Sequence, residues 1–282
     1  MINKSHLKRK DVIEYLNQQN TYTLHRPLRM NYPTRRVYVH KIDEQWQADL
    51  VDMRKYSTKN KYYNYLLTVI DCFSKYAWVI PIKKKSSQYI IDSFDIIFKH
   101  RVPKRLQTDL GKEFINKNFQ SFLNKHNVKW FATDSKYKAS IVERFNRTFK
   151  TMMWKYFTEK QTKKWIDIID DLVSNYNNTH HRSLEMTPVE ASHIDNQHIV
   201  YKNLYDVKYD NRNVKFNIGD KVRISKYKRV FTKGYLPNFT NEVFVISDVL
   251  NTHPTTYKIK DLKDNEITGI FYESELVIYN KK

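Results

Sequence analysis

The order of apolar segments from Gln45 onward most constrains what this chain can fold into. Three β-type runs come first, namely "QWQADLVDM", "NYLLTVID" and "KYAWVIPI", and the short "CFS" connection between the last two suits a hairpin. Helix-type and strand-type patterns then alternate through "SSQYIIDSFDIIFKH", "PKRLQTD", "GKEFINKNFQSFLNKHN", "VKWFA" and a helix that contains "SIVERFNRTFK". A β-β-β-α-β-α-β-α order predicts an α/β domain with a mixed five-stranded sheet and helices on its faces.

The predicted helices each carry their apolar residues on one side, as expected for helices that pack on a sheet. The inward residues of the first helix are Ile90, Ile91, Phe94, Ile97 and Phe98, and those of the second are Phe114, Phe119, Phe122 and Leu123. At 100° per residue, the third helix places Glu143, Arg147 and Lys150 on one ridge, with Asn146 beside them. Its opposite side holds Phe145, Phe149 and Met152, so we expect this side to pack on the sheet.

Changes in composition along the chain indicate four parts. Residues 1–44 form a basic appendage with one short helix in "DVIEYLNQQN" and a Pro-punctuated arm, and residues 45–194 form the α/β core. The core ends with two further helices, "KKWIDIIDDLVSNYNNTHH" and "TPVEAS". Residues 195–213 are polar and are interpreted as a linker. Residues 214–280 contain short β-type runs between Gly, Asn and Pro, which predicts a small all-β barrel.

Charge and cysteine content narrow the class of protein. Among 282 residues there are 50 Lys and Arg but 30 Asp and Glu, a formal net charge of +20, so an anionic partner is expected and nucleic acid is the leading candidate. A general bias toward Asn, Lys and Tyr is the alternative explanation. The single cysteine, Cys72, excludes a disulfide within the chain and disfavours structural zinc. No membrane-spanning run or apolar signal core is visible, so we expect an intracellular protein that is neither secreted nor membrane-bound.

Three carboxylates from distant parts of the core are candidates for a common site. Asp49 lies in the first strand, Asp109 follows the "RLQT" strand, and Glu143 lies near the start of a helix. Acids at strand ends and helix starts can meet at one edge of an α/β sheet, and hard oxygen ligands suit Mg²⁺ or Mn²⁺. Taken alone, Glu143 with Arg147 is equally an ordinary i,i+4 surface pair. The other nearby acids are Asp52, Asp71 and Asp134. Asp52 points to the opposite face of the strand from Asp49, and Asp71 suits a turn.

Four motifs together resemble the D,D,E core of retroviral-type integrases, which has an RNase H-like fold. They are "WQADLVDM", "LTVIDCFSKYAW", "LQTDLGKEF" and "SIVERFNRTFK", and the resemblance covers about residues 45–192. "YTLHRP" and the tail "GDKVRISKYKRVFTKGYLPNFTNEVF" resemble integrases of Maverick/Polinton elements and virophages. Two features depart from the retroviral pattern: Ala139 and Ser140 stand where a Gly is familiar, and residues 1–44 lack the His/Cys zinc site.

The resemblance implies both a reaction and its residues. Asp49, Asp109 and Glu143 match the three metal-binding acids, so two Mg²⁺ or Mn²⁺ ions are expected, with 3′-end processing and strand transfer of element DNA into target DNA. The barrel would be SH3-like or chromo-like, and chromatin is a further candidate partner. The expected DNA contacts are Lys136, Lys138, Arg147, Lys150, Lys221, Arg223, Lys226, Lys228 and Arg229.

The family resemblance also sets expectations for assembly and location. Integrases of this type act as multimers on paired double-stranded DNA ends, so a homo-multimer is expected, located in the nucleus or a viral factory. Two other functions stay open at this point. One is an RNase H-like nuclease acting on RNA–DNA hybrids, and the other is a domesticated, catalytically inactive DNA- or chromatin-binding protein.

Overall fold

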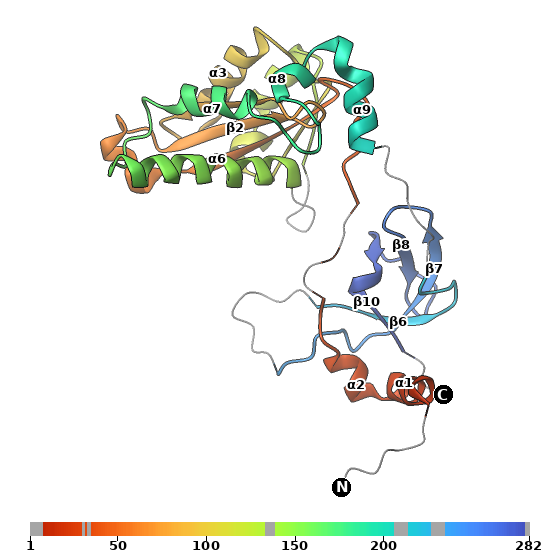
Figure 1. Ribbon diagram of the computed structural model, residues 1–282. Coiled ribbons are helices and arrows are strands. Elements are labelled where there is room, and N and C mark those ends of the chain that lie inside the picture. The colour runs from red at the N-terminus through yellow and green to blue at the C-terminus, as the bar shows by residue number, and fades with distance from the viewer. Residues whose placement is uncertain are drawn as a thin grey trace. The chain divides into compact units, whose positions relative to one another are not determined.

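The computed structural model describes residues 8–29, 32, 35–132, 139–205, 214–226 and 235–279 (Figure 1). The chain divides into two compact units. One comprises residues 37–208, and the other joins residues 1–36 to residues 209–282. Within the described part of the chain, no helix has the length and apolar character needed to cross a bilayer.

The larger unit is built on a mixed five-stranded sheet, as the order of segments predicts. Its strands are β1 (Gln45–Asp52), β2 (Tyr65–Asp71), β3 (Ala77–Ile82), β4 (Arg105–Thr108) and β5 (Lys129–Ala132). They lie in the order β3-β2-β1-β4-β5. β1 pairs antiparallel with β2, which pairs antiparallel with β3, whereas β4 runs parallel to both β1 and β5. The central strand β1 therefore joins the antiparallel and parallel halves of the sheet.

Alternation along β1 separates the two faces of the sheet, because successive side chains of a strand point to opposite sides. Trp46 and Ala48 face a core completed by α3 (Ser87–Phe98), α4 (Lys112–Ile115) and α5 (Lys117–Lys125). Val51 belongs to the opposite core, completed by α6 (Ser140–Glu159) and α7 (Ile169–Asn177). Figure 1 shows α6 as the long green helix lying beside the sheet.

Several helices differ from their predicted extents. The segment predicted as one helix after Asp109 is two, because the Asn116 side chain accepts a hydrogen bond from Phe119 N at 2.9 Å and starts α5 anew. The predicted loop after β1 contains the 3₁₀ helix η1 (Arg54–Lys59), and α7 is shorter than the pattern indicated. Pro188 begins the predicted short helix α8 (Pro188–Ala191).

The buried side of α6 agrees with the helical wheel in part. Phe145 and Phe149 are buried as predicted, whereas Met153 is the fully buried methionine and Met152 is only partly buried. Asn146, predicted beside the polar ridge, is 6% exposed. A polar side chain buried at this point needs a partner, and it finds one in the sheet, as described below.

The interpretation of residues 195–213 as a linker is wrong for their first half. The 3₁₀ helix η2 (Ile194–Asn196) leads directly into α9 (Gln197–Tyr205). Val200 and Leu204, four residues apart on one helix face, are buried in a cluster with Val39 and Leu184, and this burial stabilises the helix. Residues 206–213 lie outside the described part of the chain.

The smaller unit contains the predicted all-β segment. Its strands are β6 (Lys221–Ile224), β7 (Phe244–Leu250), β8 (Thr256–Lys260), β9 (Phe271–Tyr272) and β10 (Leu276–Ile278), with the 3₁₀ helix η3 (Glu273–Glu275) before β10. They form one sheet in the order β10-β6-β7-β8-β9. β9 and β10 lie at opposite edges, and among the described residues no strand pairing joins them into a closed barrel.

The N-terminal segment belongs to the smaller unit. It forms α1 (Arg9–Gln18) and α2 (Asn20–His25), drawn in red in Figure 1. The backbone N–H of Asn238 donates to the carbonyl of Leu24 at 2.7 Å, and the Asn238 side chain donates to the carbonyl of Arg26 at 2.9 Å. Residues far apart in sequence therefore share one folded body, which composition did not indicate.

Candidate active site

Asp49 lies on β1, and Asp109 directly follows the end of the neighbouring parallel strand β4. Gln47 of β1 is the register partner of Gln107 of β4, and each aspartate follows its glutamine by two residues. Side chains two residues apart on a strand share a face, so Asp49 and Gln47 belong to the face that α6 covers, and Asp109 lies near enough for its charge to act on Asp49. The sheet thus brings together two of the three predicted acids.

The surroundings of Asp49 show that a second negative charge lies nearby. One carboxylate oxygen accepts the N–H of Leu50 at 2.8 Å, and the other accepts the Asn146 side-chain amide at 2.8 Å. Burial raises the pKa of Asp49, and the charge of Asp109 raises it further, while the Leu50 hydrogen bond and Lys150 act in the opposite direction. The net effect is a raised pKa for Asp49. The contribution of Asp109 to this rise means that the two like charges repel each other at neutral pH.

Local hydrogen bonds fix the end of β4 where Asp109 stands. Asp109 Oδ1 accepts the N–H of Gly111 at 3.0 Å, which turns the chain toward α4. The Thr108 hydroxyl donates to the carbonyl of Asp109 at 2.8 Å and accepts the indole N–H of Trp130 at 3.1 Å. Trp130 belongs to β5, so the neighbouring strand helps to hold the aspartate in place.

A second carboxylate, that of Glu113, lies beside Asp109. A Cβ atom placed on Gly111 would come within 2.6 Å of Glu113 Oε1 and 2.9 Å of Asp109 Oδ1. Both carboxylates thus approach the same point, and only a residue without a side chain leaves room for them. The Glu113 side chain is 2% exposed and pairs with the Lys85 ammonium at 2.9 Å.

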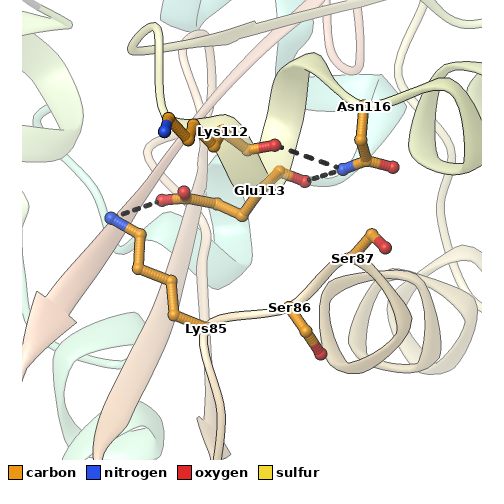
Figure 2. A pocket seen from close by; sticks show the side chains of 6 residues that line it. All are labelled: Lys85, Ser86, Ser87, Lys112, Glu113 and Asn116. Atoms are coloured by element: carbon orange, nitrogen blue, oxygen red, sulfur yellow. Dashed lines mark hydrogen bonds and ion pairs between the residues drawn. The ribbon is translucent and has the colours of Figure 1, made fainter.

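Figure 2 shows this pair at the edge of a cavity, with Lys85 reaching across to Glu113. The cavity has a volume of about 360 Å³. Its other lining residues are Ser86, Ser87, Lys112 and Asn116. The hydrogen bond to Glu113 raises the pKa of Lys85, and the negative charges of Glu113 and Asp109 add to this effect, so the ammonium stays charged beside the aspartate.

Glu143 is exposed on the first turn of α6, and the structure does not place it in a group with both aspartates. Across the described ranges, no three His, Cys, Asp or Glu side chains lie close enough together to hold a metal ion. The helix that carries Glu143 is nevertheless attached on both sides of it. Ile141 and Val142 donate their N–H groups to Gln47, and Asn146 donates to Asp49.

The donor atoms present at Asp49 fit a hard divalent cation. Two carboxylates that repel each other on adjacent strands lose that repulsion when a cation lies between them. The Asn146 amide must direct its nitrogen at the carboxylate, which leaves its oxygen buried with no hydrogen-bond partner among the residues that the structure describes. An orphaned oxygen beside a carboxylate is the kind of group that Mg²⁺ or its bound water satisfies.

The other acids near Asp49 have structural partners. Asp52, at the end of β1, accepts three side-chain hydrogen bonds from Arg54 on the surface. Asp71 is fully buried and accepts the Ser74 hydroxyl at 2.6 Å and the Arg101 guanidinium at 2.9 Å, in keeping with the predicted turn role. Asp134 lies outside the described residues.

The predicted DNA contacts have different outcomes. Arg147 and Lys150 are exposed on α6, and Lys221 and Lys226 are exposed in the smaller unit. Those outside the described residues are Lys136, Lys138, Lys228 and Arg229.

Arg223 does not fit the predicted role, because its side chain is buried and bonded within the smaller unit. It is 2% exposed and donates to the carbonyls of Thr240 at 2.7 Å and Asn241 at 2.9 Å, and to the Asn20 side chain. The guanidinium also lies over the Tyr279 ring, 4.3 Å from its centroid. We therefore withdraw Arg223 from the DNA contacts and assign it a structural role.

Sequence reasoning did not identify Gln47, Glu113 or Lys85 as parts of this site. Gln47 has the same strand parity as Asp49, so alternation alone could have placed it on the same face. Glu113 and Lys85 carry no comparable signal. The pairing of Lys85 with Glu113 joins the loop before α3 to α4, and their meeting depends on how α3 and α4 pack.

Comparison with known proteins identifies the family of this chain. The family model described as "Integrase core domain" matches residues 39–136. A putative uncharacterized transposon-derived protein of Caenorhabditis elegans is 32% identical over 207 residues, which cover 73% of this chain and 69% of that protein. The Pro-Pol polyprotein of feline foamy virus is 26% identical over 184 residues, or 64% of this chain. The match covers 16% of that much longer polyprotein.

Among solved structures, a chain of the simian T-cell lymphotropic virus intasome has a similar fold. Its TM-score is 0.61 with 13% sequence identity, and the match covers 94% of this chain and 92% of that one. At this identity the likeness concerns the fold alone. Together with the matched core model and the nematode relative, it leads to one conclusion: the chain belongs to the integrase core domain family, the integrases of transposons and retroviruses.

Proposed function

We propose that this integrase catalyses metal-dependent 3′-end processing of element DNA and its strand transfer into target DNA. The single observation that carries the proposal is the pair of carboxylates on β1 and at the end of β4, where burial and then the charge of Asp109 raise the pKa of Asp49. Two repelling acids next to an orphaned amide oxygen have little structural use, and they suit a cation-binding site.

In this proposal Asp49 and Asp109 hold the ions, and Glu143 completes the ligand set from α6. Glu143 stands one helical turn before Asn146, which bonds to Asp49, so a change of side-chain rotamer can bring its carboxylate toward the aspartates. When bound, two Mg²⁺ or Mn²⁺ ions would supply stabilisation of the negative charge that develops on the attacking and leaving oxygens. Asn146 keeps Asp49 oriented by its hydrogen bond.

Positive side chains around the acids would position the DNA backbone. Lys150 lies close enough to Asp49 to lower its pKa, and Lys85 stands between Glu113 and Asp109. Arg147 shares the exposed ridge of α6. These cations would attract phosphates to the edge of the sheet where the acids lie, because polyanion binding releases counterions.

The remaining parts of the proposal rest on the family. We propose that the chain acts as a homo-multimer on paired double-stranded DNA ends, in the nucleus or a viral factory, and that its source is a Maverick/Polinton-type or virophage-type element. The similar chain of the simian virus comes from a complex described as an intasome, and this description supports a multimer. The β-sheet of the smaller unit, proposed to be an SH3-like or chromo-like domain, presents Lys221 and Lys226 for DNA or chromatin.

The decisive experiment is a strand-transfer assay with oligonucleotides that carry candidate terminal repeats, comparing the wild type with Glu143→Gln. The expected result is joining by the wild type in Mg²⁺ or Mn²⁺ and loss of joining in the variant, with DNA binding retained. Full joining by Glu143→Gln would refute the role of this residue. Cleavage of an RNA–DNA hybrid without joining would favour a nuclease, and DNA binding without either reaction would favour an inactive binding protein.

A further inference from the structure

The helix that carries Glu143 is capped by a side chain from the sheet. An α-helix leaves the N–H groups of its first turn without partners inside the helix. Ala139, the residue before α6, has no side chain that can accept them. Gln47 Oε1 accepts the N–H of Ile141 at 2.9 Å and that of Val142 at 3.0 Å instead. The residue after these two is Glu143.

The orientation of the Gln47 amide is determined by its neighbours. Its oxygen accepts two N–H groups from α6, so its nitrogen must face β4, where it donates to Gln107 Oε1 at 2.9 Å. Gln107 Oε1 also accepts the Gln45 amide at 3.0 Å. All three glutamines are buried, with exposed fractions of 0% for Gln47 and 5% for the other two. We call Gln45, Gln47 and Gln107 the glutamine relay.

The relay connects the three elements that carry the predicted acids. Gln47 stands two residues before Asp49 on β1, Gln107 stands two residues before Asp109 on β4, and the two glutamines are register partners. A second attachment, from Asn146 to Asp49, lies one turn further along α6. Glu143 stands between these two attachments. The hydrogen bonds to Gln47 and Asp49 therefore oppose any shift of α6 along its axis, or rotation about it, relative to Asp49.

We propose that Gln47 is a positioning residue that sets the distance and rotation of the Glu143 helix relative to the Asp49–Asp109 pair. This rests on the proposed function, because it assumes that these acids bind the metal. A carboxamide suits the task chemically, since it accepts from the helix and donates to the next strand without adding charge. A hydrocarbon of the same length can do neither, and it leaves the first turn of α6 unattached.

The test compares Gln47→Met with Gln45→Met in the full chain. Both replace a buried relay glutamine by a side chain of similar length, but only Gln47 contacts α6. The readouts are Mn²⁺ binding by titration, amide hydrogen exchange of Ile141 and Val142, and strand transfer. We expect Gln47→Met to bind Mn²⁺ about 10–100-fold more weakly, as is usual when a residue that orients a metal ligand is lost. Hydrogen exchange at the Ile141 and Val142 amides should accelerate in Gln47→Met. Gln45→Met should stay near the wild type in both Mn²⁺ affinity and amide exchange.

Gln47→Glu supplies a second variant, because it keeps the acceptor for both N–H groups. It should retain the protection of Ile141 and Val142 and bind Mn²⁺ no more weakly than the wild type. Weaker Mn²⁺ binding with both amides still protected would overturn the inference even if Gln47→Met does not fold. Unchanged Mn²⁺ affinity in Gln47→Met, or equal weakening in Gln45→Met, would overturn the inference.

Failure of the proposed function gives a different result. If the wild type binds Mn²⁺ but joins no DNA, the function fails, and weaker Mn²⁺ binding by Gln47→Met still supports positioning. If the wild type joins DNA and Gln47→Met binds Mn²⁺ normally, the function stands and the positioning role falls. A wild type that binds no Mn²⁺ overturns both.

Discussion

Replacing Asp49 by Asn should abolish strand transfer and at the same time stabilise the larger unit. Burial and the charge of Asp109 raise the pKa of Asp49 above its usual value, so the folded state disfavours the ionised carboxylate. The neutral amide removes this cost. It also keeps both hydrogen bonds, provided that the Asn146 amide turns to present its oxygen. Activity should fall because an amide is a weak ligand for Mg²⁺.

The direction of the effect follows from linkage, since the variant lacks a carboxylate that the folded state disfavours in its ionised form. The variant should therefore have the higher Tm at pH 7, and each 1 kcal/mol of added stability raises the Tm of a domain of this size by about 2–4 °C. The pH dependence of stability is opposite to that of an aspartate whose pKa is lowered in the folded state. A raised folded pKa means that the wild type loses stability as pH rises from 3.8 through the raised value, so the advantage of the variant should vanish in acid.

Thermal unfolding of both proteins across pH, with and without Mg²⁺, checks this reasoning. Saturating Mg²⁺ at 100 times its dissociation constant should stabilise the wild type by about 2.7 kcal/mol and leave Asp49→Asn unchanged, which reverses their order. Asp52→Asn is the matched control, because Asp52 lies three residues away and its pKa is lowered by a hydrogen bond from Arg54. A lower Tm for Asp49→Asn at pH 7, or equal stabilisation of both proteins by Mg²⁺, would refute the argument.

Three further substitutions test other parts of the structure. Gly111→Ala should displace the Glu113 and Asp109 carboxylates, because the added Cβ would come within 3 Å of both. The affinity for Mn²⁺, measured by titration, should therefore fall, and an unchanged affinity would show that the two carboxylates do not crowd Gly111 at the metal site. Lys150→Ala should weaken DNA binding and reduce the salt dependence of the affinity by about one phosphate contact. The measurement is DNA affinity as a function of salt concentration, and an unchanged slope would remove Lys150 from the DNA interface. Arg223→Met should lower the unfolding free energy in urea by roughly 3 kcal/mol, because the hydrogen bonds of the buried guanidinium to Thr240, Asn241 and Asn20 are lost, while DNA affinity is unchanged. Lost affinity at normal stability would return Arg223 to the DNA surface.

Much of the larger unit could be predicted because its signals are local. Alternation identified the five strands, and i,i+3/i+4 apolar spacing identified the inward faces of α3 and α6. The sequence predicted that Asp49 and Asp109 could meet at one edge of the sheet, and the pairing of β1 with β4 brings them near each other. The break at Asn116 was missed because one side chain, accepting one backbone hydrogen bond, outweighed a continuous apolar pattern. The helix α9 was missed because its polar residues concealed two buried positions, Val200 and Leu204.

The sequence by itself determined the class of fold, the integrase resemblance and the candidate acids, since strand and helix periodicity depend only on neighbouring residues. Tertiary structure alone decided which polar side chains are buried and what they bind. Arg223 looked like a phosphate contact until packing enclosed it, and Asn146 and Gln47 looked ordinary until the sheet and α6 met. A buried polar group takes its role from its hydrogen-bond partners, and those partners come from strands and helices far away in the chain.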